Sequence, residues 1–273
     1  MRAYSLPFVK LRYLAVLLFA IYCSLFTLPA SAQGDDFGFD FSPEAQKKID
    51  KKWSVSLEGE LRTRNDAKTN DRWSVGLGAD YKATKWLKAS VGYYYLYYNN
   101  ERISYYEADD GAVDDGDAEV GDPKKRGQYW QGRHRFNVSL TFSKKLVGDF
   151  KFSLRERWQY TYRPEYTVDE RWSYLKNAYD GKEHTYRGKG NNVLRSRLQV
   201  EYDKSKMPVT PYASVELFNA KSLEKIRYQA GVDWSITKQH AIGAFYRYQH
   251  VSDKEEADEP NRHLIGLSYK LKL

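Results

Sequence analysis

The segment Trp53-Ser-Val-Ser-Leu-Glu-Gly-Glu-Leu-Arg-Thr-Arg64 decides the fold class, because its side chains alternate between apolar and polar. A period of two places Val55 and Leu57 on one face of a β-strand and Glu58 and Glu60 on the other. The segment has twelve residues, about twice the length of an ordinary globular strand. It therefore predicts a long strand with one entirely apolar face.

Ten segments with this period follow one another along the chain. They are 53–64, 72–84, 86–99, 131–144, 150–163, 192–203, 209–219, 224–237, 239–251 and 261–273. In the four clearest segments the apolar face carries no charged residue, and the opposite face is rich in Glu, Asp, Lys and Arg. Alternation alone leaves two architectures open, because a soluble sandwich buries the apolar face and a membrane barrel turns it to lipid.

Strand length, connection length and aromatic placement favour the membrane barrel. A tilted strand of about 9–11 residues crosses a bilayer. Short turns alternate with longer connections, the longest being 100–130 and 164–191, which we expect on the extracellular side. Rings occur at two levels along the strands and are predicted to form two interfacial girdles, from Trp53, Trp73, Tyr93, Tyr95, Tyr97, Trp234, Tyr246 and Tyr248. We therefore predict an all-β, ten-stranded antiparallel transmembrane β-barrel over residues 53–273, with both ends of the chain in the periplasm.

The N-terminus predicts export. Lys10 and Arg12 precede an apolar run that ends before Ala30-Ser-Ala32, the arrangement of a signal peptide over residues 1–32 with cleavage after Ala32. A transmembrane anchor is the alternative, but the apolar run is short for a membrane span. The predicted location is the outer membrane of a Gram-negative bacterium. Residues 33–52 are polar and acidic, and we expect a periplasmic segment with a short helix that begins at Ser42-Pro43.

Charge and cysteine content exclude several functions. The net charge of +8 includes Arg2, Lys10 and Arg12 of the predicted signal peptide, so 8 − 3 leaves +5 for the exported chain. This mild excess does not indicate a nucleic-acid-binding protein. Cys23 is the only cysteine and lies in the predicted signal peptide, which leaves no disulfide or thiol chemistry. We predict neither a bound metal nor a cofactor.

The polar faces predict a basic lumen. Its arginines would be Arg62, Arg64, Arg133, Arg135, Arg155, Arg157, Arg195, Arg197, Arg227 and Arg247, and its acids Glu58, Glu60, Asp80, Glu201, Glu216 and Asp233. A barrel of this size is largely filled by its own side chains. Three interpretations remain open: a salt-bridged closed interior, a constriction selective for anions, or a lumen into which the acidic leader Asp35, Asp36, Asp40 and Glu44 folds back.

The long connections offer candidate binding surfaces. Residues 107–122 contain eight carboxylates, which are either solvated or a calcium site, although their spacing differs from an EF-hand loop. Residues 165–190 mix tyrosine and tryptophan with charged residues. They form either an extracellular binding surface for a ligand or protein, or a lid packed on itself.

His250 and Ser252 are the weak catalytic candidates. They lie two residues apart on one strand face, which resembles the His-x-Ser pair of outer-membrane phospholipases and lipid A deacylases. A nucleophilic serine needs a base and an orienting group. Asp253, Glu255, Glu256 and Asn261 are the nearby choices for the third position.

The final strands carry a family resemblance. The segment from Ile226 to Gln249 (IRYQAGVDWSITKQHAIGAFYRYQ) and the ending His263–Leu273 (HLIGLSYKLKL) resemble a family of Bacteroidota outer-membrane barrels, domain of unknown function 2490. The resemblance extends from about Trp53 to Leu273 and implies a membrane barrel without assigning an activity.

The sequence favours a non-enzymatic outer-membrane barrel that binds through its loops or serves envelope structure, with a narrow, basic lumen. The alternatives are restricted passage of anions, or a lipid hydrolase that uses His250 and Ser252. The predicted partners are outer-membrane lipid, an extracellular ligand or protein at the loops, and an anionic solute.

Overall fold

The computed structural model of the protein describes residues 35–106, 120–205, 207–252 and 260–273, and residues 36–273 form one compact unit. Within these ranges, no helix has an apolar stretch long enough to cross a bilayer. Eleven long strands build the wall: β1 (Asp36–Lys48), β2 (Trp53–Arg64), β3 (Thr69–Lys82), β4 (Leu87–Tyr105), β5 (Pro123–Val147), β6 (Phe150–Arg163), β11 (Lys189–Tyr202), β12 (Val209–Asn219), β13 (Leu223–Ser235), β14 (His240–Val251) and β15 (Arg262–Lys272).

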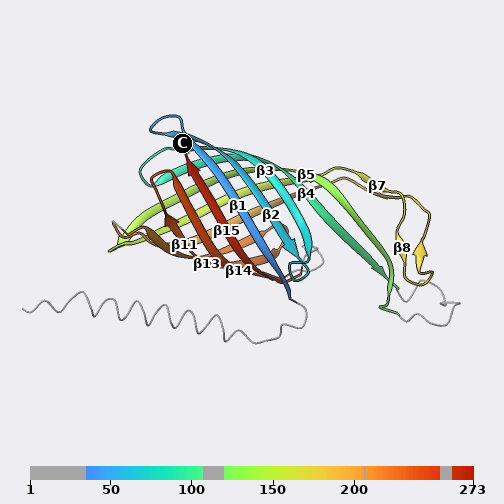
Figure 1. Cartoon of the computed structure of the whole chain (residues 1–273). Helices are drawn as coiled ribbons and strands as arrows, with labels where there is room; N and C mark the ends of the chain where they lie inside the picture. Colours follow the sequence, from blue (N-terminus) through green and yellow to red (C-terminus); the bar gives the residue numbers. More distant parts are fainter. Residues whose placement is uncertain (1–34, 107–119, 206, 253–259) are drawn as a thin grey trace, which may run out of the picture. The chain divides into compact units, whose positions relative to one another are not determined.

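The sheet closes on itself in two steps. Sequential wall strands pair antiparallel, while β1 pairs with β15 in parallel, from Asp36 opposite Arg262 to Gln46 opposite Lys272. The pairing of β4 with β5 completes the ring (Figure 1). A closed ring leaves no wall strand with an unpaired edge, as a membrane requires.

Strand β1 corrects three expectations. The helix predicted from Ser42-Pro43 is wrong, since Asp36–Lys48 is a strand. The barrel therefore begins at Asp36 instead of residue 53, and it has eleven strands instead of ten. With an odd number, the chain enters β1 at one end of the barrel and leaves β15 at the other, so the expected return of both ends to one side is also wrong.

The wall accommodates proline within β1. Proline has no amide hydrogen to donate to a ladder, and the β1–β2 pairing skips Ser42 and Pro43 between Phe41–Leu61 and Glu44–Glu58. Pro43 packs against Gly59, where an added Cβ would lie 3.1 Å from the proline Cγ. Gly59 thus leaves the space that lets β1 continue past the proline.

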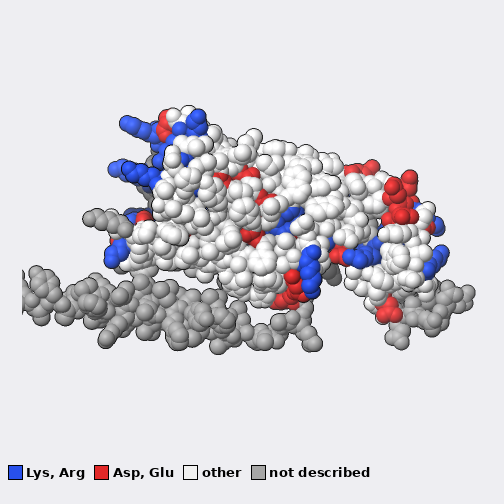
Figure 2. All heavy atoms as spheres, in the orientation of Figure 1, with Lys and Arg blue, Asp and Glu red and all other residues white. Residues whose placement is uncertain are grey.

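The apolar face points outward and the polar face points inward. Leu57 and Leu77 on the outer face are 51% and 62% exposed, whereas Asp40 and Gln249 on the inner face are each 2% exposed. Figure 2 shows a largely uncharged wall between charged ends. This is the arrangement of a membrane barrel and the reverse of a soluble sandwich, whose polar residues face water.

The long connections are more regular than expected. Strand β4 continues to Tyr105 and β5 begins at Pro123, so much of the predicted loop 100–130 is a two-stranded extension of the wall. Loop 164–191 contains four short strands: β7 (Tyr166–Val168), β8 (Trp172–Ser173), β9 (Ala178–Tyr179) and β10 (His184–Tyr186). Strand β8 pairs with β5, which attaches this loop to the extension (Figure 1).

Strand β1 supplies the acids of the leader to the interior. Asp40 accepts hydrogen bonds from Arg62 Nη2 at 2.7 Å and Arg247 Nη1 at 3.1 Å. Asp36 pairs with Arg262 at 2.8 Å. The interpretation in which the acidic leader folds back into the lumen is wrong, because this segment is strand β1 of the wall, from which Asp40 contacts the arginines.

The parallel closure can be tested by disulfide trapping. In a Cys23→Ser background, Phe39→Cys with Ile265→Cys joins Cα partners of β1 and β15. Neighbouring strands lie about 4.8 Å apart, within the Cα separation of disulfides. We expect oxidation to close a loop over most of the chain, seen as faster migration on a denaturing, non-reducing gel.

The matched control is Phe39→Cys with Leu271→Cys. Leu271 faces Ala45 in the same ladder and lies six residues beyond Ile265, about 20 Å away at 3.3 Å per residue. This pair should not crosslink. Equal crosslinking of both pairs, or of neither, would contradict the register of β1.

The second prediction concerns the buried charge of Asp40, whose side chain is 1% exposed. Asp40→Asn should lower the free energy of unfolding by about 3–5 kcal/mol, because two arginines lose their buried counter-ion. Glu44→Gln is the control: Glu44 pairs with Lys270, but both side chains are partly exposed, so the loss should stay below about 1 kcal/mol. Urea unfolding followed by tryptophan fluorescence measures both, and equal losses would contradict the assignment.

Candidate functional site in the lumen

A cavity of about 650 Å³ occupies the lumen and is lined mainly by charged side chains from alternate positions of the wall strands. Its basic residues are Arg62, Arg72, Arg102, Arg133, Arg135, Arg157, Arg163, Lys189, Arg195, Lys225, Arg227 and Arg247, and its acids are Glu58, Glu60 and Glu224. Twelve basic groups against three acids among the described lining residues make this cavity strongly cationic.

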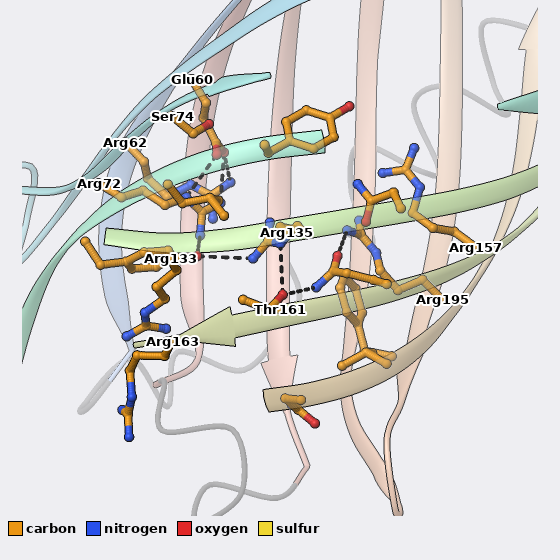
Figure 3. A pocket seen from close by; sticks show the side chains of 18 of the residues that line it. Glu60, Arg62, Arg72, Ser74, Arg133, Arg135, Arg157, Thr161, Arg163 and Arg195 are labelled. Carbon is orange, nitrogen blue, oxygen red and sulfur yellow. Dashed lines mark hydrogen bonds and ion pairs between the residues drawn. The ribbon is translucent and has the colours of Figure 1, made fainter. Parts of the chain in front are cut away.

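The charges are distributed unevenly around the ring. Glu58 and Glu60 come from β2, and the arginines at 133, 135, 157 and 195 come from β5, β6 and β11. In the strand order of the barrel, β6 and β11 lie four and five strands from β2, across the lumen. Figure 3 shows Glu60 beside Arg62 and Arg72, with Arg157 and Arg195 farther away. Arg135 lies between the two groups, because it and Arg72 both donate to Tyr98 Oη, at 3.4 and 2.7 Å. The two acids of β2 thus share their side of the cavity with Arg62 and Arg72, and the other wall strands contribute mainly basic groups.

One acid on the β2 side, Glu60, is already neutralised, whereas Glu58 accepts hydrogen bonds from the hydroxyls of Tyr94 and Ser56. Glu60 accepts hydrogen bonds from Arg72 Nε and Arg72 Nη2, both at 2.9 Å, and it also pairs with Arg62. Arg72 additionally donates to Tyr98 Oη at 2.7 Å. These charge-assisted contacts are the strong kind, so this side serves the integrity of the wall.

Three arginines of β5 and β6 have neutral hydrogen-bond partners. Arg135 donates to Thr161 Oγ1 at 3.2 Å and Arg157 Nε donates to Ser139 Oγ at 2.9 Å. Arg133 donates to Asn100 Oδ1, and its guanidinium lies 4.1 Å from the centre of the Tyr98 ring. Within the described ranges, no carboxylate forms an ion pair with Arg133, Arg135 or Arg157. Arg227 likewise donates to a neutral group, Gln249 Oε1, at 2.9 Å. These arginines are available to a bound anion.

A second cavity of about 160 Å³ shares Arg157, Arg195, Arg227 and Arg247 with the first. In the second cavity, Glu216 pairs with Arg155 at 2.6 Å and, at 2.9 Å, with Arg195, which lines both cavities. Arg155, Arg197 and Glu216 line only the second cavity. The lumen is thus divided by a charged bridge, which narrows any path along the barrel.

Tyr94 narrows the same region. Its hydroxyl donates to Glu58 Oε2 at 2.9 Å. Its ring occupies the space in front of Gly76, where an added Cβ would overlap the ring atoms. Gly76 is therefore required for Tyr94 to lie against the wall.

The remaining predicted lumen residues lie outside both cavities. Arg64 pairs with Glu101 at 3.5 Å, Asp80 accepts a hydrogen bond from Ser90 at 2.6 Å, and Glu201 pairs with Lys151 at 2.9 Å. Asp233 lies opposite Gly243. The sequence prediction missed the cavity residues Arg72, Arg102, Arg163, Lys189 and Lys225. Arg72 was predictable. It directly precedes Trp73, whose side chain points outward, so strand alternation turns Arg72 inward with the polar residues.

The predicted girdle residues lie on the outer face, and several contact other rings there. Trp73 packs against Tyr95 and Tyr97, with ring centres 6.0 and 5.4 Å apart. Trp53 and Trp234 are about half exposed. Tyr93 and Tyr246 hydrogen-bond to the imidazoles of His134 and His263 at 2.8 and 2.6 Å, while Tyr248 stacks on His263.

Asp180 organises the aromatic loop. It accepts hydrogen bonds from the backbone amide of Arg171 at 2.9 Å, from Lys125 Nζ at 2.8 Å and contacts His184 Nε2 at 2.9 Å. Burial by itself would raise the pKa of Asp180, but these hydrogen bonds outweigh it and hold the pKa well below the ordinary value of aspartate. The loop therefore packs on the β5 extension through a carboxylate that stays charged.

His250 and Ser252 are both exposed at the end of β14. Within the described residues, no hydrogen bond joins their side chains. Asn261 Oδ1 accepts from the backbone amide of Val251 at 2.8 Å, while Asp253, Glu255 and Glu256 lie outside the described residues. The hydrolase interpretation stays a prediction without an assembled site.

The structure does not describe most of the acidic loop 107–122, since residues 107–119 lie outside the described ranges. Among the residues that are described, no group of three or more His, Cys, Asp or Glu side chains could hold a metal ion.

Comparison with solved structures returns β-barrel domains. The β domain of the Bordetella autotransporter Brka is 13% identical over 86% of this chain and 95% of that chain, with a TM-score of 0.49. The translocator domain of autotransporter NalP from Neisseria meningitidis is 13% identical over 76% and 72%, with a TM-score of 0.49. The NanC porin is 13% identical over 78% and 86%, with a TM-score of 0.40. The fold assignment itself rests on the closed sheet.

Sequence comparison gives a family without an activity. No curated protein matches the chain. The family model described as "Protein of unknown function (DUF2490)" matches residues 38–261, which spans the wall from β1 to the beginning of β15. The chain therefore belongs to the DUF2490 family.

Proposed function

We propose that this protein is an outer-membrane barrel that binds small anionic solutes in its lumen and passes them slowly. One observation carries the proposal: Arg133, Arg135 and Arg157 line the larger cavity with neutral hydrogen-bond partners. A guanidinium that is removed from bulk water without a counter-ion is costly. An anionic solute would supply the missing charge.

The chemistry of the cavity favours carboxylate or phosphate solutes over cations. Guanidinium groups bind both anions through two parallel hydrogen bonds. The wall acids Asp40 and Glu60 are occupied by their own arginines, so they offer little to a cation. The bridge formed by Arg155, Glu216 and Arg195 supports restricted passage instead of an open pore.

The membrane location belongs to the same proposal. The exposed apolar face and the paired rings of Trp53–Tyr81 and Trp73–Tyr97 support insertion in a bilayer. We place the short turns in the periplasm and the long connections outside, as in other outer-membrane barrels. A signal peptide over residues 1–32, cleaved after Ala32, would direct the chain there.

Binding at the loops is the second candidate function. Tyr179 is 60% exposed at the edge of a loop that Asp180 holds in place. An exposed ring on a fixed loop suits an extracellular ligand or protein.

The anion proposal can be tested by reversal potentials in planar bilayers under a potassium chloride gradient. The wild type should conduct with anion selectivity. Arg135→Gln with Arg157→Gln should lower the anion-to-cation permeability ratio by about sevenfold per charge, because losing a charge ~7 Å away in water disfavours the anion and favours the cation by ~0.6 kcal/mol each.

The control is Lys176→Gln with Lys182→Gln, which removes two exposed positive charges from the loop. Because these groups lie in solvent, the permeability ratio should not change. A silent bilayer would contradict passage. An equal change in both double variants would mean that the lumen arginines do not determine the selectivity.

A further inference from the structure

A rim of exposed lysines surrounds the end of the barrel that carries the short turns. Each of these turns, or the strand end beside it, contributes a lysine: Lys51, Lys85, Lys144, Lys204 and Lys238. Figure 2 shows this end, on the left, dominated by blue side chains. The lumen cavities do not include these residues, so the rim is separate from the anion site.

Three acids lie in the turns at this end, Asp50, Asp149 and Asp203, fewer than the five rim lysines. Asp50 accepts hydrogen bonds from the backbone amides of Lys52 and Trp53, at 2.6 and 2.7 Å, and so caps its own turn. Asp203 is paired with Lys145 at 3.0 Å. Lysines therefore remain in excess around the perimeter, and their ammonium groups are exposed.

The rim lies at a defined depth. Aromatic pairs mark the membrane interface at this end, with ring centres 4.8 Å apart for Trp53–Tyr81 and 5.9 Å for Trp86–Phe142. Lys52 directly precedes Trp53 and Lys85 directly precedes Trp86. One residue of strand is about 3.3 Å, and the headgroup layer of each leaflet is about 5–7 Å thick. The lysines thus reach the level of the lipid phosphates.

We infer that this rim binds anionic glycerophospholipids, of the phosphatidylglycerol kind, in the leaflet around the short turns. Each lysine near an anionic surface contributes about 1 kcal/mol, roughly fivefold in association, and lysine side chains extend along the wall to reach the headgroups. The inference rests on the proposed insertion in a membrane, and it does not depend on anion passage.

The test uses the full barrel in vesicles that contain phosphatidylcholine and phosphatidylglycerol, with one of the two brominated in its chains. Bromine quenches tryptophan fluorescence on contact, and Trp53, Trp86 and Trp234 lie at the level of the rim. The ratio of quenching by the two lipids gives their relative association constant with the barrel.

The rim variant combines Lys51→Gln, Lys85→Gln, Lys144→Gln and Lys238→Gln, one from each of four turns. The control variant removes four exposed lysines from the opposite end: Lys68, Lys176, Lys182 and Lys221, each to Gln. Wild type and control should prefer phosphatidylglycerol by at least about fivefold, the contribution of one lysine. The rim variant should lose most of that preference.

Three outcomes would overturn the inference. The first is no preference in the wild type, and the second is an equal loss in both variants. The third is binding of soluble polyglutamate by the detergent-solubilised wild type and not by the rim variant, without any lipid preference, which would assign the rim to a soluble acidic partner. Unchanged gel mobility of unheated samples confirms that both variants fold. The ion selectivity of the rim variant in planar bilayers tests the lumen proposal independently of lipid binding.

Discussion

Closure of the sheet is the constraint on which the rest of the structure depends. In a bilayer no water can satisfy a strand edge, so every wall strand needs two neighbours. Strand β1 provides the last neighbour by pairing in parallel with β15 on one side and antiparallel with β2 on the other. Because β1 is acidic on its inner face, the strand that closes the wall also carries Asp40 to Arg62 and Arg247. Closure and charge balance are thus supplied by the same thirteen residues.

The lumen separates two uses of arginine. Arg62, Arg72 and Arg195 are tied to carboxylates of other wall strands or of their own, so changing them disturbs the wall. Arg133, Arg135 and Arg157 donate to Asn100, Thr161 and Ser139, which are neutral. Substituting arginines of the second group removes positive charge but leaves no buried carboxylate without its ion-pair partner. A solute-binding role is therefore compatible with a stable barrel for this second group.

Periodicity predicted most of the wall and missed its beginning. Segments 53–64, 150–163 and 209–219 agree with β2, β6 and β12 to the residue, because strict alternation and clear turns bound them. The alternation Phe37, Phe39, Phe41 was equally present, but Ser42-Pro43 suggested a helix start. Proline is tolerated here because Gly59 of β2 packs against it and two positions of the β1–β2 ladder are unpaired. Both features depend on a neighbouring strand, so the local sequence of β1 does not reveal them.

The candidate site was predictable in composition and not in arrangement. Strand alternation predicted ten inward-facing arginines, and nine of them line one or both cavities; Arg64 is the exception. Parity cannot tell which arginine meets a carboxylate, since that depends on strand order around the ring and on side chains such as Glu216, which joins Arg155 of β6 to Arg195 of β11. The division of the lumen into two cavities follows from that pairing. Strand order around the ring thus decides where an internal carboxylate narrows the lumen, which alternation along a single strand cannot reveal.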